Sequence, residues 1–251
     1  MKDSTIHHFS LASLLTFDLT ERSRLCEHLD DFSSHDPHIA ATLRNLEQVN
    51  VWLSGIRQLC NAMIFAPTPI MGNKPLTIVD LGCGGGDLAL WLSRRCSQKG
   101  IEARIIGIDH DPRIAAIALE RCSRDRRITI LNQSADSLDK LDGSIDWVVS
   151  NHFLHHLAED EIMSLLPVAA RRAGYGVIMN DLVRSRIALV GFGFLCKAAK
   201  PVGHTAHDGI VSIMRSFTKK ELQKMLRVSG LSPAAVRRTG IGHQAVVFRR
   251  V

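Results

Sequence analysis

The segment Thr77–Ala89, TIVDLGCGGGDLA, constrains the fold of this 251-residue chain more than any other. Apolar residues surround Asp80, four glycines follow between positions 82 and 86, and an apolar helical pattern begins at Leu88. This order predicts a buried strand, a tight turn and the start of a helix. Glycine is needed where φ is positive or where a ligand must touch the main chain, so the turn is a candidate binding loop.

The loop differs from a dinucleotide-binding loop of spacing G-x-G-x-x-G because its sixth position is Asp87. An acid at the start of a helix would oppose a pyrophosphate. Asp80 suits a cationic group, and the next predicted strand, Ala103–Asp109, ends in an acid that can hold both hydroxyls of a ribose. Two acids around a glycine loop therefore describe a site for a positively charged nucleoside without phosphate, such as S-adenosyl-L-methionine (SAM).

Apolar runs alternate with helical patterns between Leu76 and Gly176. Strands are expected at Leu76–Leu81, Ala103–Asp109, Ile128–Gln133, Ile145–Ser150 and Gly176–Asn180, and helices at Asp87–Gln98, Pro112–Arg124 and Asp160–Ala173. This alternation predicts an α/β fold with a doubly wound parallel sheet, in which ligands bind beyond the carboxyl ends of the strands.

The flanks of this region predict helical additions. Residues 1–72 should form an N-terminal cap, with a helical pattern from Glu21 to Phe65 that ends at Pro67 and Pro69. Residues 73–251 should form the main domain, with a helical insertion at about 182–215 acting as a lid. Two last strands, Ala234–Thr239 and Gln244–Arg249, are expected to form an antiparallel hairpin at the edge of the sheet.

Four segments, VDLGCGGGDLA, GIDHDP, QSAD and VVSNHFLHHL, resemble the class I SAM-dependent methyltransferases over Leu76–Asp181. Two more, LRNLEQVNVWLSGIR and HDGIVSIMRSFTKKEL, resemble the small-molecule subset of ubiquinone and polyketide O-methyltransferase type. The resemblance implies a Rossmann-like sheet of seven strands, six parallel and one antiparallel, with SAM as cofactor. The residues that it assigns to the cofactor are Asp80, Gly82, Gly84, Asp109, His110, Ala135, Asp136 and Asn151.

Two of these assignments have an ordinary structural alternative. Asp136 occupies the place where family members bind the adenine amino group, and Ala135 would add a backbone contact. Asp136 could instead serve as the N-cap of the short turn at Ser137–Leu141, although adenine binding is the favoured role. His110 would lie along the adenine face or would be a surface histidine.

The segment SNHFLHHL contains the candidate catalytic histidines. His152, His155 and His156 are spaced i, i+3 and i+4, so one helical face could hold all three. A metal site is set aside, because no further cysteine or histidine pair supports one. Histidine titrates near neutral pH and suits proton removal. By resemblance, His155 or His156 is the general base with Asp181 supporting it. Packing of His156 beside the helix, or an N-cap role for Asp181, stays open.

The acceptor is expected to contact His152, Arg57, His207 and Arg215. Arg215 could hold a phenolate or carboxylate, whereas Arg57 could be a surface charge with Trp52 in the core. Apolar side chains of the insertion could line a chamber for an aromatic or acyl group, or could only pack the lid onto the core. The apolar residues concerned are Phe192, Phe194, Leu195, Ile210 and Met214.

Composition narrows the class of function. The net charge is +6, but lysine and arginine are scattered and no aromatic residues alternate with them, which argues against nucleic acid as partner. None of the six cysteines forms a C-x-x-C pair, and no apolar run is long enough to span a membrane. We therefore expect a cytoplasmic protein, and the resemblance implies an enzyme that acts on a phenolic or polyketide-like small molecule. A homodimer is the assembly to test.

Three other functions remain to be weighed against metal-independent O-methylation. C-methylation of an electron-rich ring would use the same base. Methylation of nucleic acid or protein is disfavoured, because amino-methylating relatives carry Asn/Asp-Pro-Pro-aromatic after the fourth strand, where this chain reads SNHF. A binding protein without activity is disfavoured by the intact acid, glycine loop and second acid.

Overall fold

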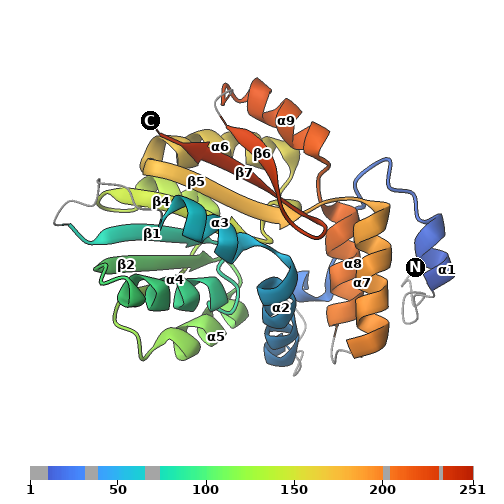
Figure 1. Ribbon diagram of the computed structural model, residues 1–251, viewed down its shortest axis with the longest axis horizontal. Coiled ribbons are helices and arrows are strands. Elements are labelled where there is room, and N and C mark those ends of the chain that lie inside the picture. The colour runs from blue at the N-terminus through green and yellow to red at the C-terminus, as the bar shows by residue number, and fades with distance from the viewer. Residues whose placement is uncertain (1–10, 32–38, 66–73, 200–203, 232–233, 251) are drawn as a thin grey trace.

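The computed structural model describes residues 11–31, 39–65, 74–199, 204–231 and 234–250 (Figure 1). Pro67 and Pro69, which were expected to end the N-terminal cap, lie outside these ranges. In the described chain no helix is both long and apolar enough to cross a membrane.

A seven-stranded sheet forms the centre of the molecule, in the order β3-β2-β1-β4-β5-β7-β6. Strands β1 to β5 are parallel, and β7 runs antiparallel to both β5 and β6. The predicted sheet and its closing hairpin are therefore confirmed. The strands are β1 (Leu76–Leu81), β2 (Ala103–Asp109), β3 (Ile128–Asn132), β4 (Ile145–Asn151), β5 (Ala173–Leu182), β6 (Ala235–Gly240) and β7 (His243–Arg249).

Helices cover both faces of the sheet, because the strands are apolar on both sides. Alternate residues of β1 face opposite ways: Ile78 packs in one apolar cluster and Val79 in another. The first cluster includes α3 (Ile56–Met63) and α4 (Asp87–Gln98), and the second includes α6 (Glu159–Arg172) and α9 (Lys219–Val228). A further helix, α5 (Pro112–Cys122), packs against β2 and β3 and begins with the proline expected at that position.

A second group of helices stands beyond one end of the strands (Figure 1). Helix α8 (Thr205–Arg215) packs against α7 (Arg186–Ala199) and α2 (Ile39–Leu53), and α7 packs against the short α1 (Leu11–Thr16). The expected insertion thus consists of α7 and α8. Asp80 is the residue before the last of β1, and it lines one cavity together with residues of both insertion helices, which places the insertion over the predicted ligand site.

The prediction of helix from Glu21 onward is wrong for residues 20–31, which we call the strap. Apart from the 3-10 turn η1 (His28–Asp30), the strap is not helical. Its polar groups bond to other elements instead: the Arg22 side chain donates to carbonyls of Arg215, His155 and Leu157. Tertiary hydrogen bonds have therefore overridden the local three- and four-residue apolar spacing.

Candidate active site

The glycine loop between β1 and α4 has the strained backbone that its sequence predicts. Gly82, Gly84 and Gly86 have φ of 63°, 52° and 76°, a region that favours glycine. A Cβ at Gly82 would lie 2.4 Å from the Phe153 ring. A Cβ at Gly84 would meet no atom of the other described residues within 4 Å, and Gly84 lines a cavity. The loop at Gly84 thus presents bare main chain to whatever fills that cavity.

Asp80 is a buried carboxylate without a hydrogen-bond donor. It is 1% exposed, and neither of its oxygens has a hydrogen-bond partner in the described chain. Burial raises the pKa of Asp80 well above its ordinary value, and the nearby Asp87 and Asp109 raise it further. A buried carboxylate without a partner is costly, so this site is built for a cation or a donor that the polypeptide does not supply.

Asp109, at the end of β2, faces the same loop. Its Oδ2 accepts a hydrogen bond from Gly84 N at 2.9 Å, and its Oδ1 accepts one from Asp111 N at 3.1 Å. Burial raises the pKa of Asp109, whereas these two backbone donors lower it. The carboxylate is held in a fixed orientation at the edge of the cavity, where a strand-end acid can bind ribose hydroxyls.

A single cavity of about 830 Å³ joins the glycine loop, the histidine segment and the insertion helices. The predicted site residues that line it are Asp80, Gly82, Gly84, Asp109, His110, Asn151, His152, His155, His156 and Arg215. Ala135, Asp136, Arg57, His207 and Asp181 do not line it, although Ser134, next to Ala135, does. Asp136 is exposed in the first turn of the 3-10 helix η2 (Ala135–Lys140), where its role in adenine binding stays a prediction.

Asp181 supports His155 directly although it does not line the cavity. The Asp181 Oδ1 lies 2.7 Å from His155 Nδ1, and its Oδ2 accepts the backbone N–H of His155 at 2.7 Å. Burial would raise the pKa of Asp181, but the His155 ring and its hydrogen bond lower it to about 2. The alternative role as a helix N-cap is wrong, because Asp181 lies within β5 and α7 begins only at Arg186.

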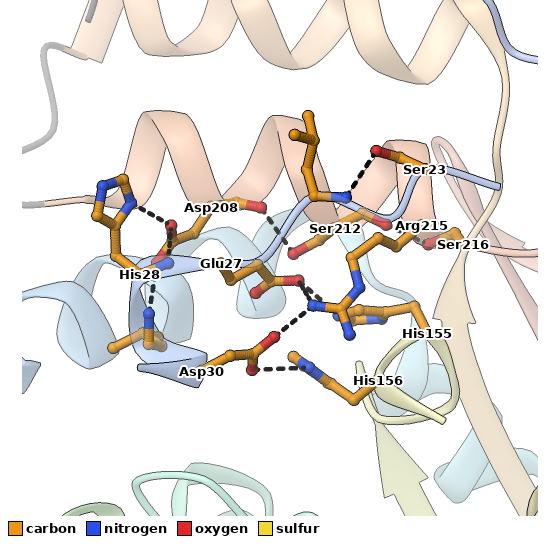
Figure 2. Close-up of polar contacts among 12 residues, drawn as sticks. Ser23, Glu27, His28, Asp30, His155, His156, Asp208, Ser212, Arg215 and Ser216 are labelled. Atoms are coloured by element: carbon orange, nitrogen blue, oxygen red, sulfur yellow. Dashed lines mark hydrogen bonds and ion pairs between the residues drawn. The ribbon is translucent and has the colours of Figure 1, made fainter. Parts of the chain in front are cut away.

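The other nitrogen of His155 faces a carboxylate that the sequence analysis missed. Glu27, in the strap, is 5% exposed, and its Oε1 lies 3.6 Å from His155 Nε2 and 3.6 Å from Arg215 Nη1. That oxygen has no hydrogen-bond partner in the described chain. Figure 2 shows Glu27, Arg215 and His155 converging from the strap, α8 and the segment after β4. Nothing in the local sequence of Glu27 marks it, because the contact joins positions 128 residues apart.

His156 binds the strap rather than packing beside the helix. Its Nδ1 lies 3.2 Å from Asp30 Oδ1, and the other Asp30 oxygen accepts a hydrogen bond from Arg215 (Figure 2). Burial would lower the pKa of His156, but Glu27 and Asp30 raise it above its ordinary value. The raised pKa favours the protonated form of His156, which makes this ring a poorer candidate for accepting a proton from the substrate.

The expected helical face of three histidines does not form. His152 has φ of 57°, and only Leu154–His156 make a 3-10 turn, η3. His152 instead stacks on His243, with Nε2 atoms 2.8 Å apart, a partner that sequence reasoning missed. Burial and the neighbouring His243 lower the pKa of His152. The rings of His155 and His156 still lie together, with centroids 4.2 Å apart.

Of the other residues considered for the acceptor, Arg57 and His207 lie outside the cavity lining, whereas part of the apolar set belongs to it. The Arg57 guanidinium lies 5.8 Å from the centroid of the Trp91 ring, and Trp52, considered as a core residue, is 84% exposed. His207 bonds to Asp208 beside the strap. Of the apolar lid residues considered for an acceptor chamber, Phe192, Phe194 and Leu195 of α7 line the cavity, whereas Ile210 and Met214 do not.

Comparison with known proteins agrees with this architecture. Residues 78–174 match the family model described as a methyltransferase domain. A SAM-dependent methyltransferase from Aquifex aeolicus has a similar structure, with TM-score 0.57 and 16% identity over 87% of this chain and 100% of that one.

The plantazolicin methyltransferases give similar values. BamL, solved with a triazolic desmethylPZN analog and SAH, has TM-score 0.59 and 15% identity over 84% of this chain and 75% of that one. BpumL, solved with SAH, has TM-score 0.60 and 12% identity over 86% of this chain and 92% of that one. This chain therefore has the Rossmann-like fold of the SAM-dependent methyltransferases, and its residues 78–174 match the model of a methyltransferase domain.

Proposed function

We propose that this protein transfers a methyl group from SAM to a hydroxyl of a small aromatic or polyketide-derived acceptor, with His155 as general base. The observation that carries the proposal is that Asp80 and His155 line the same cavity. Asp80 is a buried carboxylate with no hydrogen-bond partner among the described residues, and the His155 ring is held by the Asp181 carboxylate. A cationic nucleoside and an acidic hydroxyl are the two ligands that such a pair of sites suits.

The residues around the glycine loop fit the cofactor. Asp80 offers two buried oxygens to an ammonium group, Gly84 offers bare main chain, and Asp109 offers a fixed carboxylate to ribose. His110 and Asn151 also line this cavity, and Ala135 with Asp136 remain the proposed adenine contacts. When bound, SAM supplies an electrophilic methyl group that needs no further activation by the protein.

The protein's own part in the reaction is to remove a proton from the acceptor. Since Asp181 accepts the Nδ1 proton of His155, the ring presents the lone pair of Nε2. After Nε2 takes the hydroxyl proton, it can donate to Glu27 Oε1, whose negative charge stabilises the imidazolium. Glu27 is thus proposed to complete an Asp181–His155–Glu27 arrangement that the acceptor enters.

The insertion shapes the acceptor side. Ile187, Phe192 and Phe194 bring an apolar wall to the cavity from α7, while Arg215 reaches it from α8. Such a wall suits an aromatic ring, and the positive charge near Arg215 suits a phenolate or carboxylate. The strap, α2, α7 and α8 together are proposed as the cover that excludes water during transfer.

The direct test is a methylation screen with SAM over phenols, quinones and polyketide lactones, using NMR to locate the transferred methyl group. The proposal predicts a new O–CH₃ group. A methyl group on ring carbon would replace O-methylation by C-methylation, and modification only of nucleic acid or protein would reject the small-molecule assignment.

A further inference from the structure

A second histidine cluster lies where the strap meets α8, outside the lining of the cavity. It consists of Asp208, His207 and His28, with His204 alongside. His207 Nδ1 and His28 Nδ1 lie 2.9 Å and 3.0 Å from Asp208 Oδ1. Figure 2 shows His28 of the strap directed at Asp208 of α8.

We propose that this cluster is a binding site for a divalent transition metal, of which zinc is the best match. Two imidazole nitrogens and one carboxylate oxygen are ligands that Zn²⁺, Co²⁺ and Ni²⁺ favour. The three ligand atoms lie within 4.8 Å of one another. In a tetrahedral zinc site, metal–ligand distances of about 2.0–2.1 Å place ligand atoms about 3.3 Å apart. The two Nδ1–Oδ1 distances of 2.9 Å and 3.0 Å lie within a few tenths of an ångström of that spacing.

The local structure holds the ligands in place. His204 precedes α8 as its N-cap, and His207 and Asp208 occupy its first turn, so the motif H-x-x-H-D presents three candidate ligands close together. The backbone N–H groups of His28 and Leu29 donate to Asp208 at 2.8 Å and 3.3 Å, which fixes the carboxylate against the strap. The His204 ring stacks on His28 with centroids 4.0 Å apart, making it the candidate fourth ligand.

The three proposed ligand side chains differ in their exposure to solvent. The Asp208 side chain is 1% exposed, that of His207 17% and that of His28 38%, so the carboxylate is anchored while an ion can enter from solvent. Metal binding needs a lone pair on each Nδ1, so each ring would carry its proton on Nε2, and affinity would fall at low pH because protons compete with the metal for these nitrogens.

A competing cluster, Glu27, His155 and His156, also brings three ligand atoms within 4.8 Å. There, however, Arg215 lies 3.6 Å from Glu27, and its guanidinium opposes a second cation. A metal at His28 would instead act on the reaction site from a distance, because His28 lies between Glu27 and Asp30 in the strap. The ion would fasten the strap to α8 and so hold these two acids at the cavity.

The test is titration of the full-length protein, stripped with EDTA under reducing conditions, with Co²⁺ followed by visible absorption and with Zn²⁺ by calorimetry. We expect one equivalent of Co²⁺ with tetrahedral bands and no thiolate charge-transfer band. Zn²⁺ at a hundredfold excess over its Kd should raise Tm by about 5–10 °C.

Variants locate the ion. His207→Ala and His28→Ala should each weaken binding at least tenfold, whereas the matched control His156→Ala, which removes a strap contact but no proposed ligand, should weaken binding much less. Absence of stoichiometric binding would overturn the proposal. It would also be overturned by loss of binding in His156→Ala with retention in His207→Ala, which would place the ion in the competing cluster. These readouts do not depend on methyl transfer.

Discussion

At the residue scale, His155 is distinguished by a carboxylate at each nitrogen. Asp181 lies 2.7 Å from Nδ1 and Glu27 lies 3.6 Å from Nε2, and the ring itself is 2% exposed. His156, one residue later, is already occupied by Asp30. The two histidines that sequence reasoning left as alternatives thus have different partners, and our proposal gives proton removal to His155 alone.

Changing His155 to Ala should lower kcat by about 10²–10⁴, the usual contribution of a general base, and should leave SAM affinity unchanged. Steady-state kinetics with a responsive acceptor, combined with calorimetry, measures both quantities. His156→Ala is the matched control and should lose much less turnover. The assignment fails if His156→Ala, rather than His155→Ala, abolishes turnover.

Asp80 should make the protein without cofactor less stable at neutral pH. Burial raises its pKa in the native state, whereas the unfolded value is about 3.9. The native state thus binds more protons than the unfolded one above pH 4, so stability falls as pH rises through the raised pKa. Asp80→Asn should increase Tm at pH 7, with a gain that shrinks toward pH 4 in thermal scans. A lower Tm at pH 7 would show that Asp80 already has a stabilising partner.

At the element scale, the strap is the segment that completes the site. Its start is fastened by Arg184, which donates to the carbonyls of Leu19 and Thr20, and its end by Arg113, which donates to the carbonyls of Leu29 and Asp31. Between these anchors it delivers Glu27 and Asp30 to the cavity. A strap held by such polar contacts is the kind of element whose local opening costs less free energy than global unfolding.

Docking of the strap should weaken as pH rises. Burial alone would lower the pKa of His156, but Glu27 and Asp30 raise it in the folded protein. The stabilisation from this ion pair is therefore complete below the unfolded pKa of about 6.5 and is lost as pH rises through the folded pKa. Hydrogen exchange of residues 20–31 should accelerate above pH 6.5 beyond the intrinsic chemical rate.

The matched variant is His156→Gln, which cannot titrate. Its strap should exchange faster than that of the wild type at pH 6 and show no further opening with pH. If the two proteins kept the same pH dependence, His156 would not control the strap.

The elements differ in how far their sequence determines them. Strand β1 and helix α4 were predicted because their signals are local: an apolar run, and a glycine-rich turn that leads into an apolar helical pattern. The strap was misread as helix because its conformation depends on distant partners. Glu27 and His243 were missed for the same reason, since each meets its histidine only after the sheet and α8 have assembled.

At the scale of the whole molecule, the sheet, the strap and the insertion enclose one cavity of about 830 Å³ with two chemically different ends. One end gathers Asp80, Asp87 and Asp109 around bare main chain, and burial raises the pKa of all three. The other end gathers His155, Arg215 and the apolar wall of α7. A cationic cofactor would relieve the repulsion among these three acids.

Titration calorimetry with SAM tests this arrangement most directly, because it needs no knowledge of the acceptor. The wild type should bind one equivalent of SAM, and Asp80→Asn should bind at least about thirtyfold more weakly, as expected when a buried charge pair loses one partner. Absence of SAM binding by the wild type, or equal affinity in Asp80→Asn, would contradict the assignment of this cavity to the cofactor.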